Sequence, residues 1–191
     1  MENAMTPISL EGNILIVDDS TDTLKFLAEA IEPSGANILI AMTGEKALEV
    51  IEEVIPDVIL LDAIMPGMSG FETCRLLKKN SNLKHVPIIF MTGLSESENI
   101  VKGLQAGGVD YLVKPIDTKE LLARIDTHFQ VSQLTKQAYQ AMDFSQRFLT
   151  EISDDGLILW STPQAGKIIN IVKNVERMDD FDLELKLKKW V

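Results

Sequence analysis

Residues 58–70 read VILLDAIMPGMSG and carry strong local signals of structure. Four consecutive apolar residues open the stretch, which is typical of a strand covered on both faces, as in a parallel sheet. The run ends at Asp62, and Pro66-Gly67 then predicts a turn. Ser69, followed three residues later by Glu72, forms a capping box that predicts the start of a helix. The stretch therefore indicates a buried strand, a carboxylate at its end, and a return helix.

Apolar runs of this kind occur five times, and amphipathic helical patterns lie between them. The predicted strands are centred on residues 14–17, 38–41, 58–61, 88–91 and 111–113. Repeated alternation of strand and helix predicts an α/β domain with a doubly wound parallel sheet. At this size the favoured strand order is the flavodoxin-like order 2-1-3-4-5.

The composition is that of a globular protein with an acidic surface. The chain has 191 residues, a formal net charge of −11, 46% apolar residues and 25% charged residues. The negative charge argues against direct binding to nucleic acid or to anionic membranes. A single cysteine, Cys74, excludes an internal disulfide framework and a zinc site built from several cysteines. We expect a cytoplasmic protein, because no apolar run could span a bilayer and residues 1–13 do not resemble a secretory signal.

Polar residues stand where the predicted strands end. Asp18 and Asp19 follow the first strand, Asp62 ends the third, Thr92 the fourth and Lys114 the fifth. In an open parallel sheet, sites form at the carboxyl ends of the strands, where the strand order reverses. Crowded carboxylates repel one another unless a cation joins them, and ligation by oxygen alone suits Mg²⁺. With a lysine and a hydroxyl alongside, this set predicts phosphoryl transfer, with an aspartate able to accept the group.

Residues 13–129 resemble the receiver domain of bacterial two-component response regulators. The resemblance is carried by Asp18-Asp19, residues 62–70, Met91-Thr92 and residues 110–115, DYLVKP. It implies that Asp62 accepts a phosphoryl group from a sensor histidine kinase or a phosphotransfer protein. It also implies that Mg²⁺ is held by the three carboxylates and by the backbone carbonyl of Ile64.

The same resemblance implies a conformational switch. Lys114 and Thr92 would contact the phosphoryl group, and Tyr111 would turn inward behind Thr92. This coupled motion would shift a population between inactive and active surfaces, which include the fourth helix and the fifth strand and helix. The chain would catalyse only its own phosphorylation and dephosphorylation.

Two positions beside the predicted site carry apolar side chains. Ile64 and Leu94 lie two residues after Asp62 and Thr92 respectively, and both are apolar. In the family these positions flank the path of attacking water, so we predict slow self-dephosphorylation. We assign no role in the site to three further residues. Cys74 is predicted to be a core residue, and His85 and His128 are too far apart in the sequence to suggest a metal site.

A long helix is predicted after the fifth strand, because no proline or glycine interrupts residues 116–155. Beyond residue 130, apolar and small residues recur at spacings of three and four, which is a heptad pattern. The predicted seam consists of Val131, Leu134, Ala138, Ala141 and Phe148. We favour a dimerisation helix over the alternative, an amphipathic helix lying on its own domain. The predicted segments are a tail at 1–12, the receiver at 13–130, the helical extension at 131–152 and a small segment at 153–191.

Residues 153–191 are too few to bury a core of their own. Residues 155–165 resemble the opening of a PAS-like module and the segment that links receivers to LuxR-type domains. We expect a turn and a strand at 157–160, then a helix from 164 to 175. The chain would control either an output domain or a partner; as a stand-alone protein it would signal through this tail. A Mg²⁺-dependent phosphohydrolase is a remote alternative, because no second carboxylate lies two residues after Asp62.

Overall fold

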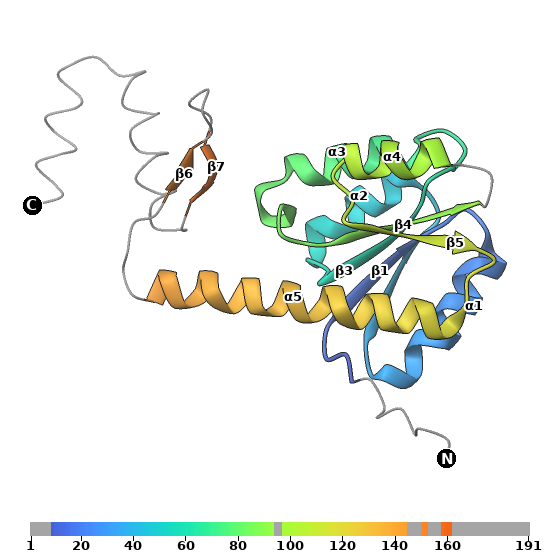
Figure 1. Cartoon of the computed structure of the whole chain (residues 1–191), viewed down its shortest axis with the longest axis horizontal. Coiled ribbons are helices and arrows are strands. Elements are labelled where there is room, and N and C mark those ends of the chain that lie inside the picture. Colours follow the sequence, from blue (N-terminus) through green and yellow to red (C-terminus); the bar gives the residue numbers. More distant parts are fainter. Residues whose placement is uncertain (1–8, 94–96, 145–149, 153–157, 162–191) are drawn as a thin grey trace, which may run out of the picture. The chain divides into compact units, whose positions relative to one another are not determined.

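A computed structural model describes residues 9–93, 97–144, 150–152 and 158–161. The chain divides into two compact units, Met1–Thr135 and Lys136–Val191. The first unit contains a five-stranded parallel sheet in the order β2-β1-β3-β4-β5 (Figure 1). Its strands are β1 (Asn13–Val17), β2 (Asn37–Ala41), β3 (Val58–Asp62), β4 (Ile88–Gly93) and β5 (Asp110–Lys114). The predicted α/β class and strand order are therefore confirmed.

Helices cover both faces of this sheet (Figure 1). They are α1 (Thr21–Ile31), α2 (Gly44–Glu53), α3 (Gly70–Lys79), α4 (Ser97–Gln105) and α5 (Thr118–Phe144), with 3-10 turns at Glu32–Ser34 and Ser81–Leu83. Side chains cap the starts of α1, α2 and α3, because Ser20, Thr43 and Ser69 each accept a backbone N–H in the first turn; of these caps, the one at Ser69 was predicted.

Alternate residues of each strand supply two separate apolar cores. Leu15 and Leu61 belong to the core beneath α2 and α3, whereas Ile16 and Leu60 belong to the core beneath α1 and α5. All five residues of β3 are buried, because this strand lies at the centre of the sheet. Burial on both faces explains why the strands appear in the sequence as continuous apolar runs.

Contacts at the amino ends of the strands join α5 to the sheet. Phe129 is 8% exposed and packs where a side chain at Gly12 would collide with it. Gln133 donates a hydrogen bond of 3.0 Å to Asp57, whose other oxygen accepts the Asn13 amide. Leu10 is fully buried, so packing begins upstream of the predicted boundary at residue 13.

The helix predicted to continue through residue 152 is shorter in the structure. α5 ends at Phe144, and residues 150–152 form strand β6 (Thr150–Ile152). β6 pairs antiparallel with β7 (Ile158–Ser161), so its backbone groups bond to another strand instead of a helical turn. Spacings of three and four are compatible with a helix, but pairing with the next strand in an antiparallel hairpin overrides that pattern here. β7 confirms the short strand predicted around 157–160.

Several predictions fall outside the part of the chain that the structure describes. These are the side chains of Ala141 and Phe148 in the seam, Leu94, and the helix predicted over 164–175. No helix in the described ranges combines the length and hydropathy needed to cross a membrane.

Candidate functional site

The predicted site residues meet at the carboxyl ends of the central strands. Parallel register places Val17 beside Leu61 and Asp62 beside Met91, so Asp18 and Thr92 follow at the same edge of the sheet as Asp62. Lys114 ends β5 at this edge, beside Gly93 of β4. Because β1, β3 and β4 are adjacent in the sheet, the residues at their carboxyl ends are neighbours in space although they are far apart in the sequence.

Three carboxylates form the acidic part of the site. One oxygen from each of Asp18, Asp19 and Asp62 lies within 4.8 Å of the other two. Asp18 and Asp62 are buried and Asp19 is exposed, so the cluster opens to solvent on one side. This set fits Mg²⁺, which takes oxygen ligands, uses one or two carboxylates and keeps several waters.

Lys114 is the cation within this cluster. Its Nζ atom donates to Oδ2 of Asp62 at 2.7 Å and to Oδ2 of Asp18 at 2.8 Å. Burial alone would lower the pKa of Lys114, but the hydrogen bonds to the two carboxylates raise it above its ordinary value. Lys114 therefore stays charged and offsets repulsion between the two buried carboxylates.

Burial has the larger effect on Asp62. Loss of water around its carboxyl raises the pKa of Asp62 above the ordinary value, although hydrogen bonds from Lys114 and from the Ile64 amide oppose that rise. The Ile64 N–H donates to Oδ1 of Asp62 at 3.2 Å. Both Asp62 oxygens therefore have donors on the protein, and the side chain is held in one orientation.

The loop after Asp62 requires glycine at two places. Gly67 has φ +76°, a left-handed conformation that glycine adopts without strain. A side chain at Gly70 would collide with the carbonyl of Asp62, so α3 can begin this close to the site only with glycine there. Ser69 accepts the Glu72 amide and fixes the first turn of α3, as its capping pattern predicted.

Thr92 and Tyr111 are positioned differently from each other. Thr92 is 3% exposed and immediately follows Met91, the residue paired with Asp62. Tyr111 pairs with Phe90 further back along the sheet, and its ring lies under the Arg124 guanidinium, 5.8 Å from Cζ to the ring centroid. The structure thus gathers Asp18, Asp19, Asp62 and Lys114 directly and places Thr92 beside them. Tyr111 instead contacts Arg124, Asp110 and Phe90, which lie outside this group.

The family model for the response regulator receiver domain matches residues 14–126, which is more than half of the chain. This chain belongs to the response regulator receiver family. Receiver domains act in two-component signalling, where they are phosphorylated on aspartate and interact with histidine kinases or phosphotransfer proteins. The acidic cluster at Asp18, Asp19 and Asp62 is the pocket through which such domains bind Mg²⁺.

Individual relatives agree with this assignment. This chain is 39% identical over 132 residues to a "Probable cyclic di-GMP phosphodiesterase" of Vibrio cholerae, and 37% identical over 116 residues to response regulator PleD of Caulobacter vibrioides. These matches cover 67% and 61% of this chain, but 30% and 26% of those proteins. A crystal structure of the receiver domain of a histidine kinase from Syntrophus aciditrophicus matches with TM-score 0.59 and 31% identity, covering 63% of this chain and 91% of that one.

One polar cluster of the receiver was missed by the sequence interpretation. Asp110 accepts hydrogen bonds from Arg124 and lies 2.9 Å from Nε2 of His128. The spacing of four between Glu120 and Arg124 was a local signal for part of it, but Asp110 comes from another element. Cys74 is a core residue as predicted: it is fully buried, and burial raises the pKa of its thiol to about 11.

Proposed function

We propose that this receiver accepts a phosphoryl group on Asp62 from a phosphohistidine of a sensor kinase or phosphotransfer protein. The observation that carries the proposal is the contact of 2.7 Å between Lys114 Nζ and Asp62 Oδ2 inside a cluster of three carboxylates. An Asp62 oxygen attacks phosphorus, a P–O bond forms, and the P–N bond breaks with its electron pair returning to the imidazole. Phosphoryl transfer of this kind depends on positioning and on neutralising charge.

The residues around Asp62 have distinct parts in this reaction. Asp18, Asp19, Asp62 and the Ile64 carbonyl would hold Mg²⁺, which supplies positive charge to the phosphoryl oxygens. Lys114 favours the ionised, nucleophilic form of Asp62 and supplies a second positive charge. The Ile64 amide keeps one Asp62 oxygen oriented. Thr92, buried beside the site, donates a hydrogen bond from its hydroxyl to an oxygen of the new phosphoryl group.

In this proposal, phosphorylation transmits a signal through a conformational change of the receiver. Movement of Thr92 toward the phosphoryl group and an inward turn of Tyr111 alter the surface of α4, β5 and α5. The receiver itself catalyses only its own phosphorylation and dephosphorylation, acts in the cytoplasm, and controls an output domain or a partner without binding nucleic acid. The relative from Vibrio cholerae is named as a probable cyclic di-GMP phosphodiesterase. That protein is more than three times as long as the segment that matches this chain, so the name describes a longer protein than the shared receiver.

Dimerisation through α5 is the second part of the proposal. Val131 and Leu134 are 58% and 66% exposed, whereas Ser132 between them is 3% exposed. The two apolar seam residues are therefore each more than half exposed, which favours a seam for a second copy over a helix lying on its own sheet.

The proposal is tested with Mg²⁺ and a small phosphodonor, followed by intact mass. We expect the mass of one phosphoryl group on the wild-type protein and none on Asp62→Asn. Asp57→Asn is the matched control, because Asp57 is also a buried aspartate and lies at the opposite end of β3. No adduct on folded wild-type protein would contradict the proposal. Steady hydrolysis of the donor by Asp62→Asn would favour the phosphohydrolase alternative.

A further inference from the structure

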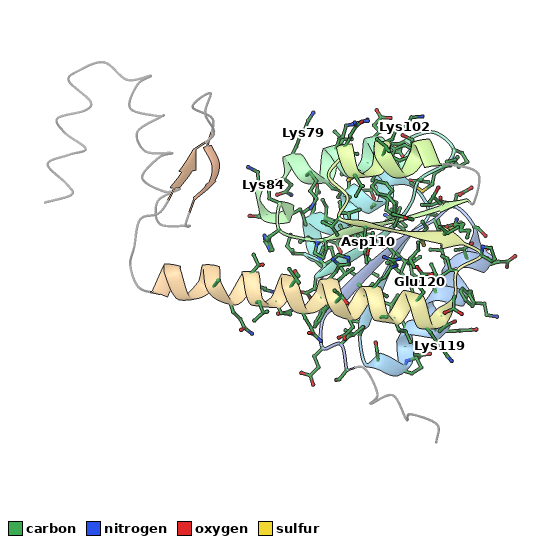
Figure 2. All side chains as sticks on the ribbon, in the orientation of Figure 1. Lys79, Lys84, Lys102, Asp110, Lys119 and Glu120 are labelled. Carbon is green, nitrogen blue, oxygen red and sulfur yellow. The ribbon has the colours of Figure 1, made fainter. Side chains whose placement is uncertain are left out.

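Arg124 on α5 is held by two carboxylates from different elements. Its Nη1 atom lies 2.7 Å from both oxygens of Asp110, at the start of β5. Its Nε and Nη2 atoms donate to Oε1 of Glu120, one helical turn earlier, at 2.9 and 2.7 Å. Figure 2 labels both carboxylates, Asp110 at the strand and Glu120 on the helix. These contacts leave the guanidinium little rotational freedom.

The fixed guanidinium lies over the ring of Tyr111. The distance from Cζ of Arg124 to the ring centroid is 5.8 Å, within the range of a cation–π contact. The backbone of Tyr111 is tied to the same group, because its N–H donates to Oδ1 of Asp110 at 2.8 Å. Asp110 therefore connects the start of β5 to the cation that covers the Tyr111 ring.

Partial burial strengthens this arrangement. The side chains of Asp110, His128 and Arg124 are 19%, 20% and 33% exposed, so water screens them less than an ordinary surface pair. Burial alone would raise the pKa of Asp110, but hydrogen bonds from His128, Arg124 and the Tyr111 amide together lower it. Asp110 therefore stays ionised and keeps Arg124 in place near neutral pH.

We propose that Arg124 is a positioning residue that holds Tyr111 in its present orientation and thereby biases the receiver against the phosphorylated conformation. This inference rests on the proposed function, in which the Tyr111 ring turns inward. When the ring turns, it leaves the guanidinium, whereas the bonds of Arg124 to Asp110 and Glu120 can remain. Of the contacts that Arg124 makes, switching thus breaks only the one to the ring, whose loss changes the equilibrium about three- to fivefold.

The test measures how tightly beryllofluoride, a phosphoryl mimic, binds the full chain at a fixed Mg²⁺ concentration. The chain has two tyrosines, Tyr111 and Tyr139, so a ¹⁹F label on tyrosine in a Tyr139→Phe background reports the Tyr111 ring alone. The apparent affinity for beryllofluoride increases as a larger fraction of the protein adopts the binding-competent conformation. We therefore expect Arg124→Gln to bind beryllofluoride about three- to fivefold more tightly and to shift the free-state ¹⁹F signal toward the bound position.

Matched variants separate positioning from general stability. Lys119→Gln removes an exposed cation from the same helix and should leave the affinity unchanged. In a Tyr111→Ala background, Arg124→Gln should have no effect, because no ring remains to hold. Glu120→Gln keeps Arg124 but removes one of its anchors, so a smaller shift in the same direction is expected even if Arg124→Gln folds poorly.

Three results would overturn the inference. They are an unchanged or weaker affinity in Arg124→Gln and Glu120→Gln, an equal effect of Arg124→Gln without the Tyr111 ring, and an equal effect of Lys119→Gln. Binding of beryllofluoride by the wild-type protein in those cases leaves the proposed function standing. Absence of any beryllofluoride binding by folded wild-type protein would overturn both.

Discussion

Lys114 and Asp62 are 52 residues apart in the sequence, yet Nζ of Lys114 lies 2.7 Å from Oδ2 of Asp62. The same ammonium donates a hydrogen bond of 2.8 Å to Asp18, so one cation is paired with two buried carboxylates. This arrangement links the stability of the receiver to its chemistry, because each group that prepares Asp62 for phosphorylation also changes the cost of burying it.

Replacing Lys114 with methionine should slow phosphorylation of Asp62 by about ten- to a hundredfold. The substitution keeps much of the side chain's volume but removes the charge that favours ionised Asp62 and stabilises the transferring phosphoryl group. The initial rate of adduct formation, followed by intact mass, checks this prediction. Lys119→Met, at an exposed position, should react at the wild-type rate.

Asp62→Asn should raise the free energy of unfolding at pH 7 in the absence of Mg²⁺. Because burial raises the folded-state pKa of Asp62 above its ordinary value of 3.8, the folded protein binds more protons than the unfolded chain between those two values. The stability associated with this group is therefore complete below the unfolded pKa and lost as the pH rises through the folded pKa.

Urea titrations at pH 7 and at about pH 3.5 test this sign, because the lower pH lies below the ordinary carboxyl pKa. The advantage of Asp62→Asn should shrink toward zero at the acid pH. Asp57→Asn should instead destabilise at pH 7, since Asp57 accepts hydrogen bonds from Asn13 and Gln133. A lower stability of Asp62→Asn than of wild type at pH 7 would contradict the prediction.

Mg²⁺ should stabilise the receiver through the acidic cluster. At a concentration ten times the dissociation constant, binding to the folded state alone adds about 1.4 kcal/mol to the free energy of unfolding. Asp19→Asn should lose most of this gain, because Asp19 is the exposed carboxylate of the cluster. Glu52→Gln, which removes an exposed carboxylate on α2, should retain it. Equal stabilisation of both variants would place the metal elsewhere.

The phosphorylated receiver should lose its phosphoryl group slowly, and Ile64→Asn should shorten its lifetime about tenfold. Ile64 is 56% exposed beside Asp62, so its apolar side chain offers attacking water no hydrogen-bond partner. An amide at this position can orient that water. Decay of the adduct by intact mass gives the lifetime, with Ile64→Leu as the apolar control. An unchanged lifetime in Ile64→Asn would exclude this explanation.

Leu134→Glu should weaken any dimer of the full chain at least tenfold, measured by sedimentation. Leu134 is 66% exposed, so the substitution adds a charge to the predicted seam without opening a cavity in the receiver core. Lys136→Glu, two residues later and outside the heptad seam, is the control and should dimerise as wild type does. A wild-type monomer in both phosphorylation states would rule out the dimer.

The strands of the sheet and the composition of the site could be predicted because both depend on local sequence patterns, and the strand order then followed from the fold class favoured at this domain size. Each strand is a continuous apolar run, and each site residue stands where its run stops, as Asp62 does after Leu61. The length of the last helix could not be predicted in this way. The spacing within residues 145–152 is compatible with a helix, but residues 150–152 pair with β7.

The sequence by itself determined the α/β class, the polar strand ends and the receiver family, since these depend on periodicity and on residue types at fixed spacings. Only the tertiary structure decided which groups touch. It brought Lys114 to Asp18 and Asp62, joined Gln133 to Asp57 across 76 residues, and set Arg124 between Asp110 and the Tyr111 ring. Such contacts depend on how strands and helices pack, because a side chain's partner across the fold is not encoded in its own neighbourhood.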